Sequence, residues 1–508
     1  MRSMRPPAPA SAPTRNAGAW LGALVVAAVA VWVFRGALDC FFAADDFPAL
    51  ARAQGLLPRL QGPWRLLSGQ LWFDLLRPLA GLDPRGYHAA GLALHAGCAL
   101  SLYALLRRRL STPAALAGAA FFAAHPAHYT ALYWVSGIGA PLALLPALGA
   151  VAVATRRGAI RWLAVPLFAA ALLARESVAL LPLGLAALLA WEGRRAGRRE
   201  RAWRDPLPWA LAALALALAL DLAFTDVLGT RSGAGAYRLD AGRAALENLL
   251  TYLGWSADFL LPAVRRFQDA VDPLAFGWGS ALLVAWLGGL ASAGLRRRGW
   301  AVAGALYLAL LGPALPLAHH TYHYYLYAPL AALAWGVAAA LDRLFAWRGA
   351  TGRGAAAAAW GAALVLATLL AWNGAALVRK VETMPFPGSP GLRLDPTVDR
   401  ARIARRAIAD LREAAPPAGT RLAFWSPIGR ALAGGGTESY FERNVRAALF
   451  EGVAVRVFCP GVDSVRFVGA YRPLPEPWRY AVYRPDGALR IASSATLDSL
   501  LAGPAPAR

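Results

Sequence analysis

Residues 39–48, with the sequence DCFFAADDFP, directly follow the first long apolar run of the chain. The stretch carries three carboxylates, and two of them, Asp45 and Asp46, are adjacent. A carboxylate pair beside a membrane helix costs free energy if lipid or protein buries it, so such a pair usually marks a polar cavity or a site. We therefore interpret this stretch as the mouth of a catalytic cavity in a membrane enzyme.

The composition of the 508-residue chain favours a polytopic membrane protein. Hydrophobic residues make up 58% of the sequence and charged residues 16%, which is too apolar for an ordinary soluble protein. The formal charge of +23 is compatible with nucleic-acid binding, but the arginines form short clusters between apolar runs. This is the positive-inside pattern of membrane proteins, so we expect no nucleic-acid partner. The Ala- and Arg-rich usage favours a bacterial source.

The apolar runs predict about eleven membrane-spanning helices, because each is close to the length that crosses a bilayer. They cover residues 17–38, 87–106, 113–129, 137–154, 160–174, 177–191, 206–224, 273–293, 300–317, 325–345 and 355–377. Residues 247–262 are predicted as an external or re-entrant helix, since a further span would place the arginines 296–298 outside. The basic, proline-rich residues 1–16 are expected to be a disordered cytoplasmic arm.

Hydrophobic spacing changes from about residue 379 to that of a soluble domain. Residues 396–415 predict a basic amphipathic helix, 420–426 a strand and 439–452 a helix. Residues 453–459 and 464–469 resemble strands, and 479–493 a hairpin. The predicted fold is therefore an all-α polytopic membrane domain, residues 17–378 with a long external loop at 39–86, followed by a small extracytoplasmic α/β domain, residues 379–508.

The aspartate pair has a second interpretation. Asp46, followed by Phe47 and Pro48, resembles the N-cap of a short helix. Capping explains one aspartate and not both, so we favour a functional role for the pair.

Two histidines lie near the outer end of the third predicted span, in the sequence HPAH. The spacing of His125 and His128 would place both rings on one face of a helix, although Pro126 disturbs that geometry. Metal binding and a structural helix end lined with aromatic side chains both remain open.

Two further polar clusters interrupt apolar runs. Arg175 and Glu176 form either an ion pair or an anion site for a lipid phosphate. The sequence HHTYHYYLY contains His320, His323, Tyr322 and Tyr325; tyrosines there are typical of an interfacial aromatic belt, whereas so many histidines are not. In the predicted topology both clusters face the same compartment as the first loop and the HPAH stretch. We therefore expect one external cavity with carboxylate, cation and imidazole groups.

These stretches, taken in order, resemble the GT-C membrane glycosyltransferases. The likeness rests on the Asp-Asp pair in the first external loop and on LLRPLAGLDPRGYHAAGLALH, AAHPAHYTALYWVSG, ARESVALLPL and HYYLYAPL. It covers roughly residues 17–345 and is strongest with the O-mannosyltransferases that carry transmembrane and tetratricopeptide repeats, and with their bacterial relatives. The C-terminal region departs from that pattern because it shows no tetratricopeptide repeats, and HHTYHYYLY replaces an acidic, arginine-containing version.

The resemblance implies a GT-C fold and transfer of a sugar from a polyprenyl-phosphate donor to an acceptor outside the cytoplasm. Asp45 or Asp46 would be the general base of an inverting reaction, and Arg175 takes the position of a basic residue before Glu, commonly lysine in relatives. The expected donor-phosphate ligands are Arg175, His125, His128, His320 and His323, and the expected substrate contacts are Arg77, Glu176, Tyr322 and Tyr325. No metal is required, although a divalent ion is compatible with the site.

The expected partners are a polyprenyl-phosphate sugar, membrane lipid, and a protein, lipid or glycan acceptor. The expected location is the bacterial inner membrane, with the N-terminus cytoplasmic and the C-terminal domain periplasmic. Two other functions stay open: a lipid-linked glycan transporter or flippase, and a non-catalytic membrane scaffold for envelope glycan assembly.

Overall fold

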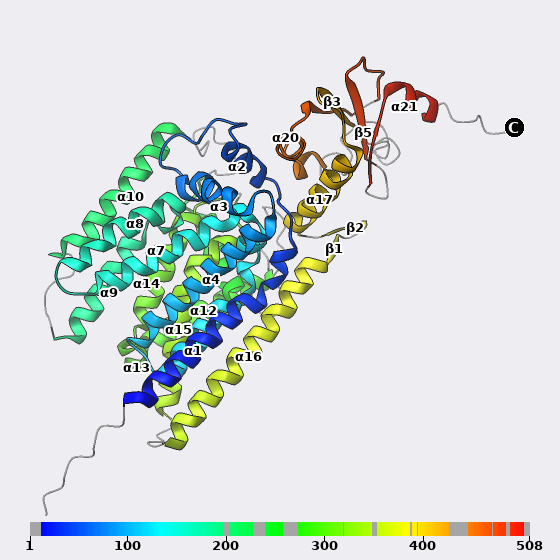
Figure 1. The fold of residues 1–508 in the computed structure, drawn as a ribbon. Helices are drawn as coiled ribbons and strands as arrows, with labels where there is room; N and C mark the ends of the chain where they lie inside the picture. Colours follow the sequence, from blue (N-terminus) through cyan, green and yellow to red (C-terminus); the bar gives the residue numbers. More distant parts are fainter. Residues whose placement is uncertain are drawn as a thin grey trace, which may run out of the picture.

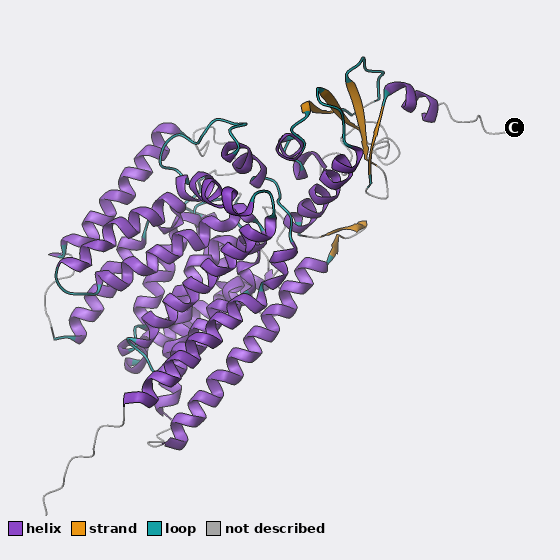
Figure 2. Cartoon of the chain, viewed as in Figure 1, coloured by secondary structure: helices purple, strands orange, loops and turns teal. Residues whose placement is uncertain are grey.

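Long apolar runs fold into helices that pack side by side in a bundle, and a smaller α/β domain adjoins one end of it (Figure 1). The computed structural model describes residues 12–197, 204–226, 239–257, 273–318, 320–347, 353–386, 389–393, 395–425, 445–469, 471–483 and 488–501. Within the described residues, the strands occur in the C-terminal part (Figure 2).

Each of the eleven predicted segments overlaps one of the longer α-helices. These helices are α1 (Ala12–Val33), α4 (Pro84–Arg107), α5 (Thr112–Ala124), α7 (Gly139–Ala154), α8 (Ala164–Ala174), α9 (Leu181–Arg195), α10 (Pro206–Thr225), α12 (Pro273–Ala291), α14 (Trp300–Leu311), α15 (Tyr327–Trp347) and α16 (Arg353–Thr383). In the described part of the chain, seven helical segments are long and apolar enough to cross a membrane, and four further apolar helices are shorter. The chain is therefore a mostly helical protein with several helices of membrane-spanning character, and the count of eleven spans stays a prediction.

Several boundaries differ from the prediction for local reasons. Helix α1 begins at Ala12, inside the predicted arm, whose residues 1–11 lie outside the described residues. Helix α5 ends at Ala124, because Pro126 lacks the N–H that would continue the helix. Helix α16 runs to Thr383, so the predicted domain boundary at residue 379 falls inside it.

The predicted external helix at 247–262 corresponds to α11 (Arg243–Ala257), and its last residues lie outside the described part. The side-chain nitrogen of Asn248 donates to the carbonyls of Leu315 and Leu317, at 2.9 and 3.1 Å. These bonds hold α11 against the segment that follows α14. One short helix, α13 (Ala293–Arg297), precedes α14.

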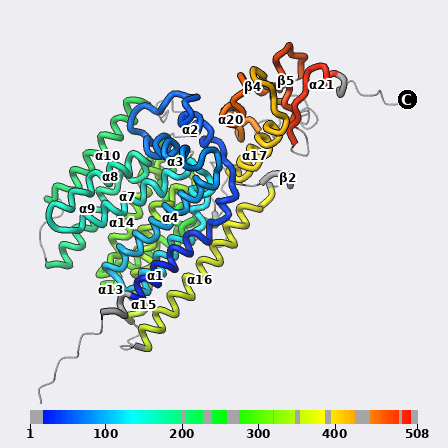
Figure 3. The backbone as a smooth tube through the Cα atoms, viewed as in Figure 1, coloured from blue at the N-terminus to red at the C-terminus, as the bar shows by residue number. Residues whose placement is uncertain are grey.

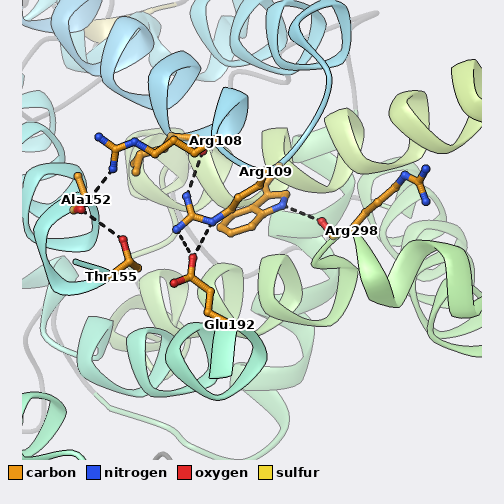
Figure 4. Close-up of polar contacts among 8 residues, drawn as sticks. Arg108, Arg109, Ala152, Thr155, Glu192 and Arg298 are labelled. Atoms are coloured by element: carbon orange, nitrogen blue, oxygen red, sulfur yellow. Dashed lines mark hydrogen bonds and ion pairs between the residues drawn. The ribbon is translucent and has the colours of Figure 1, made fainter. Parts of the chain in front are cut away.

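Two of the arginine clusters meet at Trp335 of α15: the guanidinium of Arg109 lies over its ring, and its indole nitrogen donates to the carbonyl of Arg298 (Figure 4). Arg109 donates through two nitrogens to Glu192 of α9, at 3.0 and 2.5 Å. Arg108 donates to a carbonyl of α7, and Arg298 binds Asp342 of α15 at 2.6 Å. These contacts join loops that the positive-inside pattern predicted to share one side, and the structure places them together.

The C-terminal domain contains a four-stranded sheet in the order β4-β3-β5-β6. Its strands are β3 (Thr420–Trp425), β4 (Val462–Phe467), β5 (Trp478–Tyr483) and β6 (Leu489–Ala492). Strand β3 is parallel to β4 and β5, while β5 and β6 are antiparallel, as the predicted hairpin requires. Helix α17 (Pro396–Ala414) precedes the sheet, α21 (Ser494–Leu501) follows it, and β1 (Pro385–Phe386) pairs with β2 (Ser389–Arg393) ahead of both.

One predicted strand is wrong. Residues 453–459 form helix α20 (Val453–Phe458), which begins after Gly452 in a left-handed conformation. The hydrophobic pattern of a short run that is buried on all sides does not distinguish a strand from a helix. In this run, Ala454, Val455, Val457 and Phe458 are all buried. The helix predicted at 439–452 lies mostly outside the described residues.

The first loop, residues 39–86, lies between the bundle and the C-terminal domain (Figure 3). It contains α2 (Asp46–Ala53), a π-helical turn at Leu67–Leu71 and α3 (Trp72–Ala80). The ring of Phe458 on α20 contacts Phe41, Phe42 and Phe47 of this loop, with centroids 5.4, 6.1 and 6.2 Å away. Aromatic pairs at such distances add to the free energy gained by burial. The loop and the C-terminal domain therefore share one apolar core.

Candidate functional site

A cavity of about 730 Å³ lies at the other end of the bundle from the arginine clusters. Its lining comes from the first external loop, from the connections α5–α7, α8–α9 and α14–α15, and from the first turns of α17. The predicted convergence of the first loop, the HPAH stretch, Arg175 and the HHTYHYYLY cluster is therefore found in the structure. The C-terminal domain also contributes to the lining, which the sequence did not predict.

Asp45 lines this cavity. It follows Ala44, whose φ of 47° lies in the left-handed region, a conformation that costs a non-glycine residue about 1–2 kcal/mol. Asp45 occupies the N-cap position of α2, but its side chain makes no capping bond. The surrounding protein raises the pKa of Asp45 by desolvation, and the charges of Arg65, Arg400 and Arg52 oppose that rise. The carboxylate thus faces the cavity without a structural task in the described part of the chain.

Asp46 is placed differently, although it is the next residue. It is fully buried and does not line the cavity in the described structure. Its Oδ2 accepts a hydrogen bond from the nitrogen of Ala43 at 2.8 Å. Its Oδ1 accepts from the nitrogen and the hydroxyl of Ser136 at 2.7 and 2.5 Å. Desolvation nevertheless raises the pKa of Asp46 to about 7. Asp46 therefore fixes the first loop to the connection before α7, and it does not cap α2.

Arg175 lies between α8 and α9, in an extended conformation that ends α8. The residue is 7% exposed and lines the cavity. Its guanidinium lies over the rings of Tyr324 and Tyr325, at 4.7 and 5.4 Å from their centroids. Its buried Nε has no hydrogen-bond acceptor, and no ion pair involves it, among the residues that the structure describes. The charge of Glu176 acts on Arg175 from a distance, but a buried cation without an ion pair is costly, so this geometry suits a bound anion.

Glu176 pairs with the first loop and not with Arg175. Two nitrogens of Arg65 donate to the two oxygens of Glu176, at 3.1 and 2.5 Å. This fork geometry is the strongest kind of carboxylate–arginine contact. Glu176 thus forms an ion pair, as one interpretation predicted, but its partner is Arg65. The carboxylate that was predicted to contact substrate is bound to Arg65 instead. Arg65 itself lines the cavity and has a φ of 50°.

The histidine and tyrosine cluster divides between the cavity and its support. His320, Tyr322 and His323 line the cavity. Tyr325 is buried behind them, and its hydroxyl lies 2.9 Å from Nδ1 of His320. Burial, together with the charges of Arg65 and Arg175, lowers the pKa of His320 to about 4, so its ring is neutral near pH 7. It therefore serves as a hydrogen-bonding group and adds no positive charge for a phosphate.

His125 and His128 do not reach the cavity, contrary to the prediction that they bind a donor phosphate. Both are fully buried. Nε2 of His125 lies 3.2 Å from the carbonyl of Ser256, and Nδ1 accepts from the nitrogen of Ala127. Nε2 of His128 lies 2.9 Å from the carbonyl of Phe122. His125 and His128 therefore match the other interpretation, in which they are structural residues at the end of a helix.

Arg77 is also outside the cavity. Its side chain is exposed and donates to the carbonyl of Ala53 at 3.2 Å. The cavity instead receives Arg52 and Arg65 from the same loop, Arg400 from α17 and Asp395 from the N-cap position just before α17. Charged residues are ordinary in an external loop, and Arg400 is one of five arginines in α17, so no pattern in the sequence distinguishes these residues from their neighbours.

The four arginines that line the cavity exceed the two lining carboxylates, Asp45 and Asp395, in the described residues. In this part of the chain no group of three or more His, Cys, Asp or Glu side chains is arranged to hold a metal ion. A divalent ion at Asp45 would take its other ligands from substrate phosphate and water, as Mg²⁺ often does. Comparison with protein-family models and with curated proteins gave no match to this chain.

Proposed function

We propose that this protein transfers a sugar from a polyprenyl-phosphate donor to a hydroxyl of an extracytoplasmic acceptor, with inversion at the anomeric carbon. The observation that carries the proposal is one cavity that contains a carboxylate without a structural task, Asp45, and a buried arginine that makes no ion pair in the described structure, Arg175. A sugar phosphate already has a good leaving group, so the reaction needs one base and one phosphate ligand.

Asp45 is the proposed general base. Its carboxylate takes the proton of the acceptor hydroxyl while the oxygen attacks the anomeric carbon. Desolvation raises the pKa of Asp45, and a base becomes stronger as its pKa rises. Asp46 is not proposed as the base, because its two oxygens already accept three hydrogen bonds from Ala43 and Ser136.

Arg175 is the proposed ligand of the departing phosphate. The bond from the anomeric carbon to the phosphate oxygen breaks, and the electron pair leaves with polyprenyl phosphate. A guanidinium binds two phosphate oxygens at once, and the rings of Tyr324 and Tyr325 hold it in place. Charge that develops on the leaving oxygen is therefore met by a group that is already oriented.

The membrane-length apolar helices support a multi-pass location, which we place in the bacterial inner membrane with the cavity on the periplasmic side. There the donor's prenyl chain can remain in the bilayer while the phosphate reaches the cavity. Arg400 of α17 and Asp395 just before it give the C-terminal domain a part in binding the acceptor.

The test is sugar transfer by the purified protein in lipid vesicles with a panel of polyprenyl-phosphate sugars. We expect consumption of at least one donor and release of polyprenyl phosphate. Movement of labelled lipid across the bilayer without donor consumption would instead identify a transporter. A cellular phenotype that needs only residues 379–508 and survives Asp45→Asn would identify a scaffold.

A further inference from the structure

A second cavity, of about 640 Å³, opens beside the first at the same end of the bundle. Its lining comes from the end of α1 and the turn after it, from the first turns of α4, from α6 (Tyr129–Tyr133) and from the last turns of α16. Helices α1 and α16 lie next to each other at the edge of the bundle (Figure 1). Three helices therefore contribute the ends at which they would leave the membrane.

Apolar and charged side chains share this lining. Val33, Leu38 and Val378 are among the apolar members. The charged members are Arg35, Asp39, Arg85, Arg379 and Glu382. A lining that combines apolar and charged side chains is suited to the boundary between the acyl chains and the headgroup of a lipid.

The outer faces of the two neighbouring helices, α1 and α16, carry large exposed apolar side chains. Leu369 and Trp372 of α16 are 60% and 71% exposed, and Trp20 and Leu24 of α1 are 76% and 68% exposed. Large apolar side chains on the surface of membrane-length helices face acyl chains. A ligand of this cavity is therefore expected to be an amphiphile.

Two charges of opposite sign in this cavity, Arg379 and Glu382, make no side-chain hydrogen bond or ion pair with the described residues. Asp39 pairs with Arg85 at 3.6 Å, and Arg35 donates to the carbonyl of Trp32 at 2.6 Å. No hydrogen bond or ion pair of the described structure reaches the guanidinium of Arg379 or the carboxylate of Glu382. They lie three residues apart on α16 and act on each other electrostatically, but neither is saturated by a hydrogen bond, so the cavity offers one cation and one anion to a ligand.

The second cavity is separate from the first. Tyr133 lines the second cavity and Tyr129 lines the first, and their rings stack with centroids 4.3 Å apart. Val381 lines the first cavity, whereas Val378 and Glu382 line the second. A ligand of the second cavity therefore does not occupy the space around Asp45.

We propose that the second cavity binds a zwitterionic phospholipid with a primary amine, of the phosphatidylethanolamine type. Arg379 holds the phosphate and Glu382 the ammonium group, and the acyl chains follow α1 and α16. A polyprenyl phosphate carries only negative charge, so it can pair with Arg379 but is repelled by the carboxylate of Glu382. A trimethylammonium headgroup cannot donate a hydrogen bond to Glu382.

The test is lipid retention by the purified full-length protein in mild detergent. An equimolar mixture of phosphatidylethanolamine, phosphatidylcholine and phosphatidylglycerol with the same acyl chains is added, and bound lipid is measured by native mass spectrometry. We expect the wild type to retain phosphatidylethanolamine several-fold over the other two. Glu382→Gln should remove the preference over phosphatidylcholine, and Arg379→Gln should lower retention of all three.

Matched controls are Glu413→Gln and Arg77→Gln, which are exposed and line neither cavity. They should retain lipid as the wild type does. Equal retention of all three lipids by the wild type, or preference for phosphatidylglycerol, overturns the proposal. This outcome is measured on the wild type, so it does not depend on whether a variant folds. Displacement of phosphatidylethanolamine by polyprenyl phosphate would also overturn it. The readout needs no sugar transfer, so its failure is separate from failure of the proposed function.

Discussion

Asp46 and Ser136 are joined by two hydrogen bonds, because Oδ1 of Asp46 accepts from both the nitrogen and the hydroxyl of Ser136, at 2.7 and 2.5 Å. This contact ties the first external loop to the turn before α7. It leaves the adjacent Asp45 at the cavity surface. The two aspartates of one sequence motif thus have different tasks, and the difference can be measured.

Asp45→Asn is expected to lower the rate of sugar transfer by about 100-fold to 10,000-fold, the usual contribution of a general base. The melting temperature should stay close to that of the wild type, since no structural bond of the described residues uses this carboxylate. The matched control is Asp74→Asn in the same loop, which lies outside the cavity and pairs with Arg59. Loss of transfer in the control to the same extent would contradict a specific role for Asp45.

Asp46→Asn is expected to destabilise the protein by about 1–3 kcal/mol, because an amide nitrogen would face a backbone or hydroxyl donor. The measurement is thermal unfolding in detergent. Ser136→Ala removes one of the same bonds and should lower the melting temperature by less. A wild-type melting temperature in Asp46→Asn, combined with lost transfer, would reverse the roles of the two aspartates.

Asp46 should also make stability depend on pH. Its pKa is about 7 in the folded protein and 3.8 ordinarily, so the folded state binds the proton more tightly. The stability that Asp46 contributes is fully present below its ordinary pKa of 3.8 and is lost as pH rises through about 7. The difference in melting temperature between wild type and Asp46→Asn should therefore vary across this range. A constant difference from pH 4 to pH 8 would show that the folded pKa is not raised.

Arg400→Gln is expected to move the acid side of the pH–rate profile to higher pH. Arg400, Arg65 and Arg52 oppose the rise that desolvation causes in the pKa of Asp45. Removing one of these charges leaves more of the base protonated at a given acidic pH. Arg400→Lys should restore the profile, and Arg402→Gln, exposed on the same helix, should not move it. An unchanged profile in Arg400→Gln would show that the C-terminal domain does not affect the pKa of the base.

Arg175→Gln is expected to lower kcat/KM for the donor by about 100-fold, as the loss of one oriented charge-stabilising group does. Arg175→Lys should recover part of this, because lysine supplies a charge without the planar fork. Arg77→Gln is the control. Donor kinetics equal to wild type in Arg175→Gln would exclude Arg175 as the phosphate ligand.

The fold was largely predictable because successive membrane-spanning helices run in opposite directions. The connections between them therefore alternate between the two ends of the bundle. That alternation correctly placed Arg175, His320 and the first loop at one end. Helix α20 was predicted as a strand, since local pattern does not distinguish buried strand from buried helix.

The site was predicted less well than the fold, because side-chain partners across the chain decide it. The pairing of Glu176 with Arg65 spans 111 residues. His125 and His128 turn toward carbonyls of Ser256 and Phe122, which a motif cannot indicate. Arg400 joins Asp45 only through the packing of the C-terminal domain on the first loop.

The most direct test of the central claim compares wild type and Asp45→Asn for both donor binding and sugar transfer in the same vesicles. We expect Asp45→Asn to bind the polyprenyl-phosphate sugar as the wild type does, because Arg175 is intact, and to transfer almost none of it. Transfer at the wild-type rate by a folded Asp45→Asn protein would contradict the claim.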